Sequence, residues 1–357
     1  LTDKLIATVG VRYSNEEKSA DVIYIRPRFP CSVVDGTCSA DGNNALIGLI
    51  SPPGAPAEPN GFSDSNDWSN WTPKLGLQYF WSDNVQSYAH YTKGFRSGGY
   101  NFRITDLPIF QQFVSQTGDL GFDEEEVDSY ELGFKAQSDD GRIQVNGATF
   151  ITKIANMQRE VNTAGASGVV QNIINTADGS IFGIEVDGRL AFTDSLLGTF
   201  NVGMMDAKYD EVFFDLTGDG VIDSTDLNLD LPRVPELTWG FGIIKDFDLG
   251  SNGAIVATAN FQHRDKIAYT DSNFGWVQPA DMVDVDFTWE TPFDGLSASI
   301  YGKNLLDEVQ VGNDTQLPFP GPNSTFVNLP YQDSPAFGTF SPLKKGRLVG
   351  VELTYSY

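Results

Sequence analysis

The chain has 357 residues, and its 48 acidic against 23 basic side chains give a formal charge of −25. This balance argues against a nucleic-acid partner, because phosphate binding needs a basic surface. No apolar run reaches the roughly 20 residues of a membrane helix, although hydrophobic residues make up 40% of the chain, near the norm for folded proteins.

Alternation of apolar and polar residues predicts a succession of β-strands. Residues 349–357, 281–290 and 182–192 each place apolar side chains on one face and small, polar or acidic side chains on the other. Carboxylates on the inner face of many strands cannot line a dry core unless they are paired, but they can line a water-filled lumen. Apolar-out, polar-in strands of about ten residues are typical of an outer-membrane barrel.

We therefore predict an all-β fold, an antiparallel transmembrane β-barrel with about twelve strands in this chain. The predicted strands are 3–14, 72–82, 85–97, 126–138, 142–158, 178–193, 196–209, 236–247, 253–268, 281–290, 296–305 and 347–357.

The connections between these strands alternate in length. Tight turns rich in Asp, Asn and Gly are expected at 82–84, 139–141, 193–195, 248–253 and 292–295. The long loops are expected at 15–71, 98–125, 159–177, 210–235, 269–280 and 306–346. Short turns on one side and long loops on the other are the periplasmic and extracellular sides of bacterial barrels.

The first long loop contains both cysteines of the chain, Cys31 and Cys38. Their close spacing in a loop rich in Gly, Pro and Asn predicts a disulfide, which implies an oxidising compartment. Two free thiols are the alternative interpretation.

The fourth long loop contains the stretch DLTGDGVIDSTD, residues 215–226. Counted from Asp215, side-chain oxygens occupy positions 1, 3, 5, 9 and 12 and glycine occupies position 6, as in an EF-hand calcium loop. The predicted calcium ligands are Asp215, Thr217, Asp219, Asp223 and Asp226, with the main-chain carbonyl of Val221. Threonine at position 3 and aspartate at position 12 depart from the usual pattern. The loop is similar to that of dockerin modules but lacks their flanking helix pair, and a solvated acidic loop is the alternative.

Several blocks of the sequence resemble the barrel of TonB-dependent outer-membrane receptors. They include NWTPKLGLQYFWSDNVQSYAHYTKGFRSGGYN, EVDSYELGFKAQSDDGRIQVNGATF, IFGIEVDGRL, YGKNLLDE and the terminal GVELTYSY. Each block is degenerate by itself, but together they occur in family order along essentially the whole chain. The resemblance implies a 22-stranded barrel that holds an N-terminal plug, and no plug is found in residues 1–357. We therefore expect this chain to be the C-terminal half of such a barrel, with an intact twelve-stranded barrel as the alternative.

The resemblance implies active uptake of a scarce nutrient, such as a ferric siderophore, cobalamin or a glycan, across the bacterial outer membrane. The implied partners are the small-molecule ligand, lipopolysaccharide, and TonB acting through the plug. Ligand contacts are expected on the upper lumen wall and the long loops, because arginines suit anionic chelates and aromatic rings suit catechols or sugars. The candidate residues are Arg96, Tyr100, Phe102, Arg103, His263, Arg264 and Trp276.

Two other classes of function remain open from the sequence. A barrel-embedded hydrolase would need a positioned nucleophile and base, but His90 and His263 are the only histidines and no hydrolase motif accompanies them. No catalytic residue is therefore predicted. A calcium-dependent surface adhesin would need a dry core between two sheets, which the charged inner faces of the strands contradict.

Overall fold

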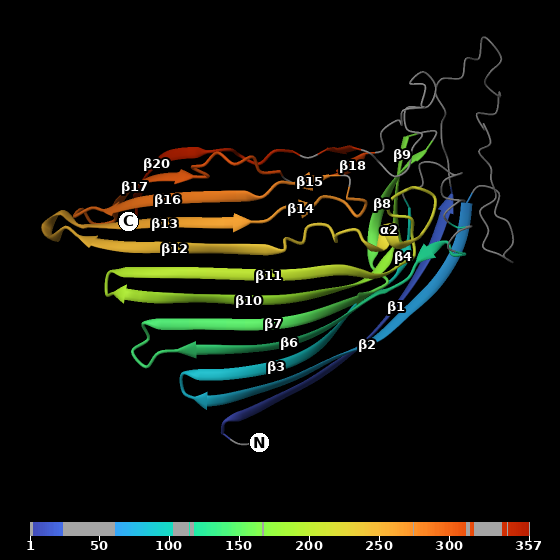
Figure 1. The fold of residues 1–357 in the computed structure, drawn as a ribbon, viewed down its shortest axis with the longest axis horizontal. Coiled ribbons are helices and arrows are strands. Elements are labelled where there is room, and N and C mark those ends of the chain that lie inside the picture. Colours follow the sequence, from blue (N-terminus) through green and yellow to red (C-terminus); the bar gives the residue numbers. More distant parts are fainter. Residues whose placement is uncertain are drawn as a thin grey trace, which may run out of the picture.

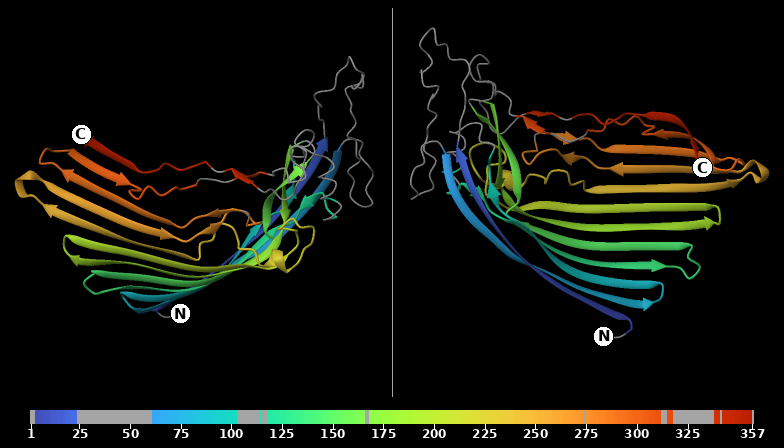
Figure 2. Two further views of the ribbon diagram at one scale, coloured as in Figure 1. Left: turned by 45° about the horizontal axis from the view of Figure 1, so that its top comes forward. Right: turned by 180° about the vertical axis from the view of Figure 1, so that it is seen from behind.

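The structure, a computed structural model, describes residues 3–23, 61–102, 114, 118–165, 168–273, 275–311, 315–317, 338–340 and 342–356. Its framework is one twelve-stranded antiparallel sheet in which each strand pairs with the next long strand of the chain. The sheet is curved into an open trough (Figures 1 and 2). The predicted number, order and direction of the strands are confirmed.

The long strands are β1 (Leu5–Ile23), β2 (Gly61–Ser82), β3 (Val85–Arg96), β6 (Glu125–Gln137), β7 (Ile143–Ala155), β10 (Ala177–Thr193), β11 (Leu196–Val212), β12 (Leu237–Asp248), β13 (Ala254–Arg264), β16 (Ala280–Glu290), β17 (Leu296–Lys303) and β20 (Leu348–Tyr355).

All tight turns lie along one edge of the sheet, at the left of Figure 1, and the longer connections lie along the other. Gly253 and Gly295 show why two of these turns need glycine. Both have positive φ, 89° and 72°, and a Cβ on either would collide with the neighbouring main chain. Short turns on one edge and longer connections on the other match the periplasmic and extracellular sides of bacterial barrels, and the two edges are called by these names below.

The first two strands are longer than the sequence analysis predicted. β1 has 19 residues and β2 has 22, and they remain paired up to Ile23 and Gly61. The predicted strands 3–14 and 72–82 were therefore too short, and the loop expected at 15–71 is partly strand. Above the membrane both faces of a strand can be polar. The alternation of apolar and polar residues that predicts the membrane-spanning halves of β1 and β2 is therefore absent from their upper halves.

Short hairpins occupy parts of the expected loops. The pairs are β4 (Gly99–Tyr100) with β5 (Gly121–Phe122), β8 (Gln158–Gly165) with β9 (Gly168–Asn175), β14 (Ile267–Ala268) with β15 (Trp276–Val277), and β18 (Thr315–Leu317) with β19 (Gly338–Phe340). A four-residue helix, α2 (Ser224–Leu227), lies in the loop between β11 and β12. All of these elements lie on the extracellular side of the sheet (Figure 1).

One face of the sheet is apolar and exposed. Val9 is 79% exposed and Val351 is 76% exposed, and large apolar side chains on every other residue of the other strands continue this surface. A soluble protein rarely presents so large an apolar surface to water, whereas a barrel presents it to lipid. Aromatic side chains, among them Trp81, Phe192 and Tyr355, are exposed beside the short turns, where an interfacial girdle is expected.

The opposite face carries polar and charged residues, such as the cross-strand partners His90 and Glu131. No helix in the described part of the chain is long and apolar enough to cross a membrane.

β1 and β20 are the two ends of the sheet. Within the described residues β1 pairs with β2 and β20 pairs with β17, and the sheet order contains no pairing between β1 and β20. The arrangement is thus an open segment of barrel wall rather than a closed ring of twelve strands.

Candidate functional site

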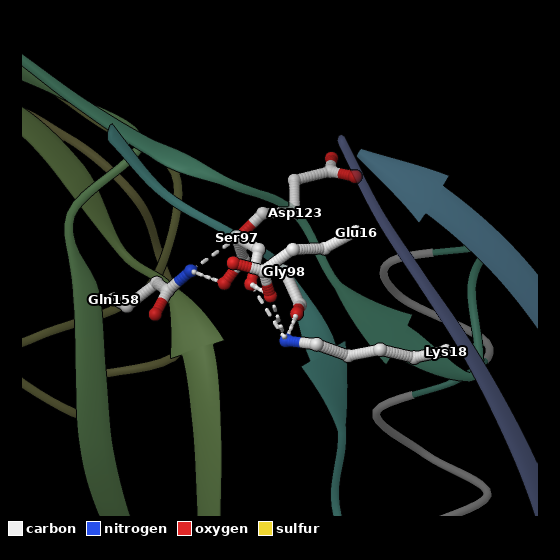
Figure 3. Close-up of polar contacts among 6 residues, drawn as sticks. All are labelled: Glu16, Lys18, Ser97, Gly98, Asp123 and Gln158. Atoms are coloured by element: carbon white, nitrogen blue, oxygen red, sulfur yellow. Dashed lines mark hydrogen bonds and ion pairs between the residues drawn. The ribbon is translucent and has the colours of Figure 1, made fainter. Parts of the chain in front are cut away.

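The extracellular ends of β1, β2, β3 and β6 meet the hairpins β4–β5 and β8–β9, and together they form the candidate site. Lys18 is at its centre. Its ammonium group donates to the Oγ of Ser97 and to the carbonyl oxygen of Gly98, both at 2.6 Å, and pairs with Glu16 at 3.4 Å (Figure 3). The Ser97 hydroxyl in turn donates to Glu16 at 2.6 Å. These contacts hold the turn after β3 against the extracellular part of the long β1 strand.

Aromatic side chains pack beneath this lysine. Trp68 is 4% exposed and Tyr100 8% exposed, and their rings meet edge to face with centroids 6.2 Å apart. The Lys18 ammonium lies 5.5 Å from the Trp68 ring centroid. The Tyr100 hydroxyl donates to Asp64 at 3.0 Å, and burial together with this carboxylate raises the pKa of Tyr100. Tyr100, predicted from the sequence to contact ligand, is thus part of a small core that supports the site.

Three amide side chains, Asn101, Gln158 and Asn175, join the β8–β9 hairpin to the segment between β3 and β6; we call them the amide clamp. Asn101 exchanges two hydrogen bonds with the main chain of Ile173, both at 2.8 Å. Gln158 donates to the carbonyl oxygens of Ser97 and Asp123, at 3.0 and 2.8 Å. The two segments are therefore held as one unit.

Asn175 completes the amide clamp on the other side of Asp123. It accepts from the Asp123 main-chain N–H at 2.7 Å and donates to the Asp123 carbonyl oxygen at 3.1 Å. Burial, with the nearby charge of Asp119, raises the pKa of the Asp123 carboxyl. The main chain of Asp123 is thus used for anchoring, while its carboxylate points away from Gln158 and Lys18 (Figure 3).

Two of the sequence-predicted ligand residues are exposed at this site. Arg96 is exposed at the end of β3, and Phe102 is 68% exposed just after β4. Arg103 lies outside the described residues, as do Cys31 and Cys38, so the predicted disulfide stays a prediction. An exposed cation and an exposed aromatic ring suit an anionic aromatic ligand.

His263 lies on the apolar face of the wall and not toward the lumen. It is opposite Trp239 and Asp281 in the sheet and stacks on the Trp239 ring with centroids 5.8 Å apart. Its ring nitrogens contact Asp281 at 2.6 Å and Asp265 at 3.1 Å. The two carboxylates therefore account for its polar contacts.

Arg264 and Trp276 also lie at this end of β13, away from Arg96. The Arg264 guanidinium donates to the carbonyl oxygens of Asp265 and Gln278, at 2.8 and 3.1 Å. Trp276, in β15, has the Lys266 ammonium 4.4 Å from its ring centroid. The predicted ligand residues thus form two separate groups on the extracellular side, one on the β3–β4 segment and one beside β13.

The predicted calcium loop is closed by hydrogen bonds from its own main chain. Asp226 is fully buried and accepts from the N–H groups of Leu216, Thr217 and Asp223, at 2.8, 2.8 and 3.0 Å. Asp215 accepts from the N–H groups of Gly218 and Gly220 at 2.6 and 2.7 Å. Gly218 and Gly220 have φ of 75° and 93°, as a turn of this sharpness requires.

The other two predicted aspartate ligands are in the same loop. Asp223 caps α2 by accepting from the N–H of Thr225, which lowers the pKa of Asp223, and Asp219 accepts from Val221 at 2.9 Å. In the described part of the chain, no three His, Cys, Asp or Glu side chains gather closely enough to hold a metal ion. The side-chain chemistry is that of a calcium site, with oxygen donors alone, but main-chain N–H groups balance the charges here. Calcium binding stays a prediction.

Calorimetry can test that prediction. We expect calcium to bind with a dissociation constant of about 10⁻⁴–10⁻³ M, the range of extracellular calcium modules, and Asp219→Ala to abolish the binding heat. The matched control is Asp294→Ala, in a short turn on the periplasmic side. Absence of binding heat from the wild-type protein at millimolar calcium would show the loop to be closed by hydrogen bonds alone.

Sequence reasoning missed Lys18, Trp68 and the amide clamp. Lys18 and Trp68 lie in the part of the first long loop that proved to be strand. The amide side chains carry no motif, because they act on main-chain atoms distant in sequence. The density of Asn and Gln next to the predicted strand ends was the one available signal.

The chain matches a known protein family along most of its length. A sequence profile described as "TonB dependent receptor-like, beta-barrel" matches residues 1–305.

Solved structures of bacterial receptors share the fold. The ferric yersiniabactin uptake receptor FyuA from Yersinia pestis is 17% identical with a TM-score of 0.65, and the alignment covers 100% of this chain and 44% of that one. The siderophore receptor PiuA from Acinetobacter baumannii is 13% identical with a TM-score of 0.63, covering 99% and 41%. The ferric-catecholate import receptor Fiu from E. coli K12 is 14% identical with a TM-score of 0.57, covering 99% and 42%. This chain thus spans less than half the length of the receptors it resembles.

Proposed function

Because the chain belongs to the TonB-dependent receptor-like β-barrel family, a family of outer-membrane transporters and not of enzymes, we propose that it forms the wall and extracellular loops of a receptor for nutrient uptake. The observation that carries this proposal is the family match over residues 1–305, on a sheet whose apolar face is exposed. The nutrient is a ferric siderophore, with cobalamin or a glycan as the other candidates.

The site chemistry favours an anionic chelate. Arg96 presents a permanent positive charge with five N–H donors, which match carboxylate or catecholate oxygens. Phe102 offers an exposed ring 68% open to solvent, against which a planar aromatic group can stack. The amide clamp supports ligand binding at this site, because it holds the segment that bears Arg96 and Phe102 in one position before the ligand arrives. This lowers the entropic cost of binding.

Energy for transport comes from the inner membrane through TonB and a plug in the lumen. The polar face of the sheet is suited to contact with such a plug, because carboxylates and hydroxyls can hydrogen-bond to a hydrated protein surface. Both TonB and the plug are partners in the proposal.

Uptake of ⁵⁵Fe-labelled siderophores by cells that express the whole protein tests the proposal. We expect uptake of at least one ferric siderophore, dependent on TonB. Arg96→Ala should weaken binding of that siderophore about 10- to 100-fold, because a hydrogen bond to a charged group contributes about 1.5–3 kcal/mol.

Arg142→Ala is the matched control, since Arg142 pairs with Asp194 at the periplasmic turns and exposed ion pairs contribute little. If the cells take up cobalamin or a glycan instead, the proposed substrate is wrong but the proposed receptor function stands. Failure to take up any of the three classes in a strain with intact TonB would overturn the proposal.

A further inference from the structure

The β8–β9 hairpin has two faces, and Gln158 and Asn175 of the amide clamp lie on the same one. Gln158 is opposite Asn175 in the hairpin register, and Arg159 is opposite Ile174. Neighbouring residues of a strand point to opposite faces. The face with Gln158 and Asn175 meets Asp123, whereas Arg159 lies on the other face, which we call the back of the hairpin.

On the back of the hairpin, Arg159 meets a carboxylate from the loop between β13 and β16. The Arg159 Nε lies 3.3 Å from an oxygen of Asp271, and the two side chains are 32% and 25% exposed. Within the described part of the chain this buried Nε makes no hydrogen bond, so charge attraction and not N–H geometry joins the pair. Such attraction is stronger for a half-buried pair than at a fully exposed surface.

A tyrosine fixes the same Asp271 oxygen to the barrel wall. The hydroxyl of Tyr209, at the extracellular end of β11, donates to this oxygen at 2.8 Å. Tyr209 is 3% exposed and packs in a core with Met157, Leu216 and Leu231, which holds its ring in one position. Asp271 therefore links the back of the hairpin to the wall.

The turn that bears Asp271 is itself held at several points. The Tyr269 N–H donates to the Gly275 carbonyl oxygen at 2.7 Å. Asn273 exchanges two hydrogen bonds with the main chain of Asp230, both at 2.8 Å. The carboxylate is thus a fixed support for the hairpin and not a side chain on a free loop.

We propose that Asp271 is a positioning residue of the nutrient site: it holds the β8–β9 hairpin from behind, and the amide clamp transmits this position to the segment that bears Arg96 and Phe102. The inference rests on the receptor function proposed above. It also connects the two groups of sequence-predicted ligand residues, because Asp271 lies in the same loop as Trp276.

Asp271 is unsuited to contact the ligand itself. A carboxylate repels an anionic chelate, and this one is already shared between Arg159 and Tyr209. Its effect on ligand affinity therefore passes through the hairpin.

Hydrogen exchange in the whole receptor in detergent, without ligand, tests the positioning directly. Asp271→Asn keeps the size of the side chain and an oxygen for Tyr209 but removes the charge. It should accelerate exchange about threefold or more in residues 158–175 and 97–102. Arg159→Met, which removes the other charge of the pair, should do the same and keeps the test valid if Asp271→Asn does not fold.

Three further variants separate positioning from a general loss of stability. Arg159→Lys should exchange near the wild-type rate, because the pair depends on charge and not on the guanidinium fork. Asp210→Asn, the same substitution in an exposed side chain next to Tyr209, is the matched control and should change neither segment. In a Gln158→Leu background, the effect of Asp271→Asn on residues 97–102 should fall by at least half, because Gln158 joins the hairpin to Ser97.

Binding of ⁵⁵Fe-labelled siderophores, one catecholate and one carboxylate, gives the second measurement. Asp271→Asn should weaken binding of the siderophore that the receptor takes up about threefold or more, and Arg159→Lys should not. Wild-type affinity in Asp271→Asn, wild-type exchange in both Asp271→Asn and Arg159→Met, or an equal change in Asp210→Asn would overturn the inference. If neither siderophore binds but exchange responds as expected, the proposed substrate is wrong and the support of the hairpin by Asp271 stands. Gel mobility with and without heating checks that each variant is folded.

Discussion

Gly98→Ala is expected to detach the turn after β3 from the β1 strand. A Cβ at this position would overlap the carbonyl oxygen of Phe122 and the indole of Trp68. The Phe122 carbonyl belongs to the β4–β5 pair and cannot swing aside as a side chain could, so overpacking should cost about 1–3 kcal/mol. Main-chain amides of Gly99 and Tyr100 should exchange hydrogen about 10- to 100-fold faster, since 1.4 kcal/mol corresponds to a factor of ten.

Gly10→Ala in β1 is the matched control. Its new Cβ would come only within 3.9 Å of Lys74, an ordinary contact. Equal exchange rates in the two variants would mean that the main chain around Gly98 yields without strain. In that case the hydrogen bonds of Lys18 would not require the turn after β3 to hold one fixed position.

Gln158→Leu is expected to loosen the β8–β9 hairpin. The substitution keeps the approximate size of the side chain but removes both hydrogen bonds that the amide N–H group donates. The partly buried Ser97 carbonyl oxygen loses this donor, while the Asp123 carbonyl oxygen keeps its bond from Asn175. Each intramolecular hydrogen bond that is lost costs about 0.5–1.5 kcal/mol, so the two together cost about 1–3 kcal/mol. Hydrogen exchange in residues 158–175 should therefore accelerate about 10-fold or more, and affinity for ligand should fall with it.

Gln171→Leu, in the same hairpin, provides the comparison. Gln171 donates to Glu160 in an exposed contact. Loss of this hydrogen bond should change the hydrogen-exchange rates of the hairpin little. The amide clamp would be refuted as the anchor of the hairpin if both variants exchanged at the wild-type rate.

The barrel strands could be predicted from the sequence because lipid on one face and water on the other enforce alternation. The pattern from Val349 to Tyr355 places β20 within two residues of its observed bounds. The upper halves of β1 and β2 could not be predicted in this way. Between Asn15 and Ile23 the sequence is mixed, because water surrounds both faces and pairing with β2 alone holds the strand.

The candidate site was less accessible to sequence reasoning. Arg96 and Phe102 could be chosen by residue type and position, and they are exposed. Tyr100 was chosen on the same grounds but is covered by Trp68 and Phe62, residues more than thirty positions away. The side of the sheet on which His263 lies was also beyond sequence reasoning. His263 is on the apolar face because it pairs with Trp239, and a register shift of one residue would move it to the lumen face.

The exposed apolar face has a consequence for how this sequence can change over time. A side chain in a dry core must fit its neighbours in shape, because protein interiors are close-packed, but Val9 or Val351 meets fluid acyl chains that adapt to any contour. Such positions specify a class of residue and not its identity, so Val, Leu, Ile and Phe can replace one another there with little selective cost. Substitutions can therefore accumulate on about every second strand residue while the hydrogen-bonded wall persists. This is compatible with the 13–17% identity to receptors whose barrels superpose on this one.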